Sequence, residues 1–144
     1  MKINFHIVLA KSFLEKIHNL QTFCNDFGFD VSFNSENLQK KLSQKKTILN
    51  IKYCNKITSP EIYLASVSDV KDICDDLCRY LKEEYDVAIV VNFNGNNVAA
   101  TYIVVAVLTK MSNGILYIEE DGCILNGDEA IKEAKAWDNL DIIN

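Results

Sequence analysis

Two apolar segments lie close together in the second half of this chain, and they constrain its fold more than any other feature. VAIVVNF, residues 87–93, is a continuous apolar run of the kind found in a central strand buried on both faces. The next segment, residues 98–111, is longer than a typical strand and ends near Gly114. Its length favours a buried helix. A hairpin is the alternative, because Asn94-Gly95 is a favoured turn dipeptide and residues 102–105 are rich in strand formers.

The rest of the chain alternates between strand-like and helix-like hydrophobic patterns. Strands are expected at 3–9, 29–34, 47–54 and 61–66, helices at 12–27, about 68–84 and from 126 onward, a short helix or mobile loop at 35–46, and a hairpin at 115–125. Ser12 with Glu15 predicts a capping box for the first helix, and Asn126 with Glu129 predicts caps for the last helix, which holds the apolar Ala130, Ile131, Ala134 and Trp137. The chain of 144 residues is long enough for one well-buried core. We therefore predict an α+β protein, a single-domain α/β sandwich of residues 1–144 with a mixed sheet and helices packed on it.

The segment DICDDLCRY, residues 72–80, places two cysteines four residues apart. On a helix, Cys74 and Cys78 would share the apolar stripe, which predicts core residues. A structural zinc site usually has two close pairs of ligands, and no second pair occurs in this chain. A nucleophilic pair of cysteine with His6 or His18 lacks any supporting motif. We thus expect no metal site, no cofactor, no catalytic residue and no enzymatic activity.

Two further segments offer other functions. NFNGNN, residues 92–97, follows a strand and could line a ligand pocket, so a small-molecule-binding or enzymatic α/β domain is the alternative hypothesis. It lacks the glycine patterns of nucleotide-binding loops. The lysines within residues 40–46 have no interleaved aromatic residues and belong to an acidic protein, which favours a solvated loop over nucleic-acid binding.

Charge is distributed unevenly along the chain. Residues 1–66 hold nine basic and five acidic residues, whereas residues 67–144 hold six basic and fifteen acidic ones. A one-sided acidic surface attracts a basic partner and repels nucleic acid and membrane phosphate. The partner-binding residues predicted on this basis are Asp72, Asp75, Asp76, Glu83, Glu84, Asp86, Glu119, Glu120 and Asp121.

The last third of the chain, where residues 98–111 run through SNGILY into an acidic hairpin, resembles the immunity proteins of bacterial polymorphic toxins. Contact-dependent growth inhibition systems include such proteins. The resemblance implies a protein that binds and neutralises one cognate toxin domain, for example a nuclease, whose basic face would suit an acidic inhibitor. The N-terminal residues lack the features of a signal peptide, and the run 98–108 is too short to span a bilayer, so a cytoplasmic protein without membrane association is expected.

Overall fold

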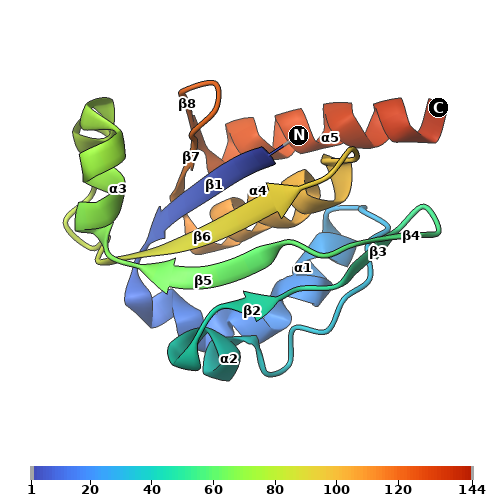
Figure 1. Cartoon of the computed structure of the whole chain (residues 1–144), viewed down its shortest axis with the longest axis horizontal. Helices are drawn as coiled ribbons and strands as arrows, with labels where there is room; N and C mark the ends of the chain where they lie inside the picture. Colours follow the sequence, from blue (N-terminus) through green and yellow to red (C-terminus); the bar gives the residue numbers. More distant parts are fainter. Residues whose placement is uncertain (1, 144) are drawn as a thin grey trace.

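The structure is a computed structural model that describes residues 2–143, with side chains up to Leu140 (Figure 1). Its strands are β1 (Lys2–Leu9), β2 (Thr47–Ile48), β3 (Ile51–Tyr53), β4 (Lys56–Thr58), β5 (Glu61–Ala65), β6 (Val87–Asn94), β7 (Ile115–Ile118) and β8 (Cys123–Asn126). Its α-helices are α1 (Leu20–Asp26), α2 (Leu38–Gln44), α3 (Val67–Ile73), α4 (Ala99–Ser112) and α5 (Gly127–Ile143). Two 3-10 helices complete the set, η1 (Lys11–Asn19) and η2 (Asp75–Arg79).

Six strands form one sheet in the order β2-β5-β6-β1-β7-β8, while β3 and β4 form a separate hairpin. The α+β class is therefore confirmed. The prediction of a mixed sheet was wrong, because every pairing between neighbouring strands of this sheet is antiparallel. The doubly buried pattern of residues 87–93 is typical of parallel sheets, but here it arises because different helices cover the two faces of β6.

The helix α4 forms the centre of the main core. All residues from Ala99 to Thr109 are buried, so the helix is covered on every side. The sheet contributes Phe5, Ile7 and Ile89 to the same core, and Figure 1 shows α4 lying behind the sheet. This outcome confirms the helix predicted at 98–111 and excludes the hairpin alternative.

The end of α4 is fixed by tight backbone packing. Asn113 adopts a left-handed conformation with φ of 54°, which asparagine tolerates better than most residues. A Cβ atom added to Gly114 would lie 2.6 Å from the carbonyl oxygen of Val8, a distance that real contacts do not reach. Glycine is thus required where the chain turns from α4 into β7 beside β1.

A smaller core lies on the opposite face of the sheet. Val70 of α3 and Leu77 of η2 pack there against Val8, Ala88 and other residues of the central strands. Figure 1 shows α3 covering only one end of this face. On the remaining part, from β5 to β7, Asn4, His6, Tyr63 and Asn92 lie around the apolar Val90, and we call this part the open face.

Several predicted boundaries were wrong. The helix expected at 12–27 is a 3-10 helix followed by α1, and Ser12 forms no cap. The helix expected at 68–84 breaks at Cys74, whose backbone is extended (φ −147°, ψ 99°). The strand expected at 29–34 is reduced to one bridge between Ser32 and Lys52, and the strand at 47–54 divides into β2 and β3. By contrast, the capping box of the last helix is confirmed by reciprocal bonds between Asn126 and Glu129.

The burial of α4 leads to a prediction about stability. Ile103 is fully buried and Ile57 is 71% exposed, so the same substitution at both positions separates packing from residue chemistry. We expect Ile103→Ala to lower the free energy of unfolding by about 2–5 kcal/mol. Ile57→Ala should change it by no more than about 0.5 kcal/mol. Urea unfolding of both variants measures these values, and equal losses would contradict the assigned core.

Candidate functional site

The first group of predicted acidic residues is carried by α3, η2 and the loop that follows. Asp72, Asp75 and Asp76 are exposed, and so are Glu83 and Glu84 in the loop. A capping box between Ser66 and Asp69 starts α3, and the buried side chains of Val70 and Leu77 hold α3 and η2 on the sheet. The acidic side chains therefore project from a segment whose apolar side is anchored.

The second group lies where β7 ends. A carboxylate oxygen of Glu119 lies 3.0 Å from Nε2 of His6, and the backbone N–H of Asn4 donates to Glu120 over 2.8 Å. Both contacts attach the tip of the β7–β8 hairpin to β1. The other ring nitrogen of His6, Nδ1, is buried and has no hydrogen-bond partner within residues 2–140. Among the described side chains, Glu119 is thus the one hydrogen-bond partner of a largely buried imidazole.

Tyr117 connects the two groups of acidic residues. Its ring stacks on that of His6, with centroids 5.7 Å apart. Burial raises the pKa of Tyr117, and Cys74, Glu119 and Glu120 raise it further because each disfavours a nearby phenolate. Tyr117 also packs in the smaller core with Leu77 of η2 and with Cys74, which precedes η2. We use the name acidic face for the exposed carboxylates that these two segments carry, Asp72, Asp75, Asp76, Glu119 and Glu120.

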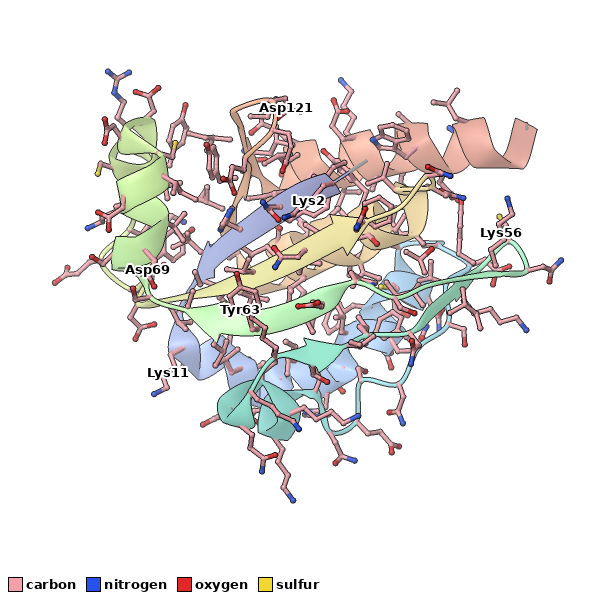
Figure 2. All side chains as sticks on the ribbon, in the orientation of Figure 1. Lys2, Lys11, Lys56, Tyr63, Asp69 and Asp121 are labelled. Carbon is pink, nitrogen blue, oxygen red and sulfur yellow. The ribbon has the colours of Figure 1, made fainter. Side chains whose placement is uncertain are left out.

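Two predicted residues serve other purposes. One carboxylate oxygen of Asp86 accepts the backbone N–H of Lys11 over 2.6 Å, which fixes the junction between β1 and η1. Asp121, labelled at the hairpin tip in Figure 2, lines a cavity on the helix side of the sheet. Neither residue belongs to the acidic face, although both are exposed as expected.

The segment 92–97, on which the hypothesis of a ligand-binding or enzymatic domain rests, forms the turn between β6 and α4. The side-chain oxygen of Asn97 accepts the backbone N–H of Ala99 over 3.1 Å and so helps to start α4. Gly95 lies against the ring of Phe93, since a Cβ atom added to Gly95 would lie 3.2 Å from Cζ of that ring. These contacts describe a strand-to-helix turn.

The predicted positions of the paired cysteines were right for Cys74 and wrong for Cys78. Cys74 packs against the smaller core, but Cys78 is exposed because the helix breaks between them. Among the residues that the structure describes, no three His, Cys, Asp or Glu side chains are grouped as metal ligands would be. Cys24 is buried in the main core, and this burial raises its pKa to about 12.

Sequence reasoning missed the cavity that Asp121 lines. Its volume is about 220 Å³, and it lies between β1, the β7–β8 hairpin and the helices α4 and α5. Trp137, predicted as an apolar position of the last helix, lines this cavity and remains 37% exposed. The acidic residues of the lining are Asp121 and Glu133. Nothing in the sequence indicates that Asp121 and Trp137, which are 16 residues apart, line one cavity.

Comparison with known proteins adds no family. No protein-family model matches the chain, and neither the curated proteins nor the solved structures that were compared gave a match. Within residues 2–143, no helix combines the length and apolar character needed to cross a membrane.

The environments of four cysteines predict their order of reactivity. At about pH 8, iodoacetamide should alkylate the exposed Cys54 and Cys78 first. Cys123 should react more slowly, since a hydrogen bond to Asp121 and partial burial raise its pKa. Cys24 should react only after unfolding. Peptide mass spectrometry over time measures each rate, and early alkylation of Cys24 in the folded protein would contradict its placement.

Proposed function

We propose that this protein is an immunity-type inhibitor that binds a basic bacterial toxin domain through the acidic face. One observation carries the proposal: exposed carboxylates of residues 72–76 and 119–120, far apart in the sequence, belong to two segments that meet in the smaller core through Cys74, Leu77 and Tyr117. Few cations neutralise them. Within the described residues the ion pairs are His6–Glu119 and Lys110–Asp128, and neither Lys71 nor Arg79 pairs with an acid.

A surface of this kind favours protein recognition for physical reasons. Carboxylates gathered with few cations among them attract a basic partner over several ångströms and raise its association rate. Both segments of the acidic face are attached to the sheet, because Leu77 anchors η2 and the hairpin tip is bonded to β1 through His6 and Asn4. A surface ordered before binding loses little conformational entropy on association.

The same properties define the expected partner. Like charge disfavours nucleic acid and anionic membranes as ligands. A toxin domain that acts on nucleic acid needs a basic surface, and an inhibitor that covers this surface would block its substrate. We place this interaction in the bacterial cytoplasm, and the inhibitor needs no cofactor or catalytic group for it.

The test compares two charge reversals of equal size. Asp75→Lys with Asp76→Lys alters the acidic face, whereas Asp26→Lys with Asp30→Lys alters exposed acids around the end of α1, away from α3 (Figure 1). Immobilised wild-type protein first captures partners from a lysate of the native host in which the toxin is expressed. The captured protein should be basic, bind one-to-one and associate more slowly as salt rises.

We expect the Asp75/Asp76 variant to reduce the association rate at least about tenfold at low salt, and the Asp26/Asp30 variant to reduce it far less. Surface plasmon resonance measures both rates, and circular dichroism checks that both variants fold. Equal effects of the two variants would show that only net charge matters. A complex insensitive to salt would also contradict the proposal.

A further inference from the structure

The cavity beside α5 combines aromatic and aliphatic walls. Phe5 of β1 meets Tyr102 of α4 edge-on, with ring centroids 5.7 Å apart, and Tyr102 lies 6.3 Å from the ring of Trp137 on α5. Ile3 and Leu125 add aliphatic surface. The volume is about 220 Å³. A cavity of about 150 Å³ holds benzene, and sites for drug-sized ligands begin near about 300 Å³, so this one suits a group the size of one side chain.

Two carboxylates line the same cavity. Asp121 is held by its own turn, because its side-chain oxygen accepts the backbone N–H of Cys123 over 3.0 Å. Glu133 reaches the cavity from α5. Neither forms an ion pair within residues 2–140, and the cavity lining contains no lysine, arginine or histidine. Burial, followed by Glu133 and Asp121, raises the pKa of Tyr102, as expected where negative charge faces the phenol.

We propose that this cavity binds an organic cation on an apolar stem, of the alkylguanidinium or alkylammonium class. Aromatic faces attract such cations, and carboxylates at the same site supply charge-assisted hydrogen bonds. The aliphatic wall would cover the methylene groups of the stem. An anion would meet two like charges, and a neutral ligand would leave both carboxylates without a cationic partner. Trp137, Tyr102 and Glu133 lie outside the acidic face, so this site stands independently of the proposed function.

The chain provides its own reporter, because Trp137 is its only tryptophan. The probe is butylguanidinium, and butylurea serves as its uncharged counterpart of similar shape. Titration is followed by the indole N–H resonance and the fluorescence of Trp137. We expect a saturable change with butylguanidinium in the millimolar range, and binding of butylurea at least about tenfold weaker. Butylguanidinium should also slow the alkylation of Cys123, which lines the same cavity.

Variants then test the carboxylates. Asp121→Asn with Glu133→Gln should weaken butylguanidinium at least about tenfold, whereas Asp75→Asn with Asp76→Asn, which removes the same charge elsewhere, should have little effect. Glu133→Gln alone provides a second test, since Glu133 makes no hydrogen bond within the described residues and its loss should not affect folding. It should weaken binding several-fold.

A glycine-flanked arginine peptide, capped at both ends, distinguishes two sources of the cation. Binding of both the peptide and butylguanidinium would indicate that a polypeptide side chain can enter the cavity. Binding of butylguanidinium alone would indicate a free small molecule, and either result supports the site. Equal affinity for butylurea, no change at Trp137 up to high millimolar concentrations, or unchanged affinity in both carboxylate variants would overturn the proposal.

Discussion

The burial of α4 on all sides is the constraint on which the rest of this structure depends. A helix that is apolar around its whole circumference must be covered around its whole circumference. The sheet covers one side, while α1 and α5 contact the others. One face of the sheet and the inner sides of these helices are therefore buried against α4. Because Gly114 allows the chain to turn tightly beside β1, the strand that follows α4 can rejoin the same sheet.

Because one face of the sheet packs on α4, the other face is available for different contacts. Among the described elements, α3, η2 and the loop that follows them cover it, and they bury a cluster around Val8 and Leu77 at one end. Farther along β1 the outward side chains are Asn4 and His6, and on β5 Tyr63 lies under the ammonium group of Lys46 at 4.8 Å from the ring centroid (Figure 2). The polar surface therefore begins where the helical cover stops. The acidic face lies at this boundary, where two separate segments supply carboxylates.

Local patterns were sufficient to predict much of the fold. The strand at 87–93, the helix at 98–111, the hairpin after it and the cap at Asn126 all follow from periodicity and turn chemistry within a few residues. The break at Cys74 did not follow, since the apolar positions 70, 74, 77 and 81 fit one continuous helix. The sheet pairings were also beyond local reasoning, because they join segments distant in the chain.

The candidate site shows the same division. Charge counting identified the exposed acids of α3, η2 and the hairpin. It could not assign Asp86 to the junction before η1 or Asp121 to the cavity, since both roles depend on tertiary contacts. The contact of His6 with Glu119 spans 113 residues and exists only because β1 pairs with β7. Which acids lie near one another thus depends on sheet register, which the order of residues alone does not reveal.

Hydrogen–deuterium exchange of the protein, free and bound to its captured partner, tests the central claim most directly. If the acidic face is the interface, backbone amides of residues 72–79 and 117–120 should gain protection in the complex. Amides of α1, α2 and the β3–β4 hairpin should stay unchanged, since these elements lie away from α3 (Figure 1). Protection of those elements, with no change at residues 72–79 and 117–120, would contradict the account.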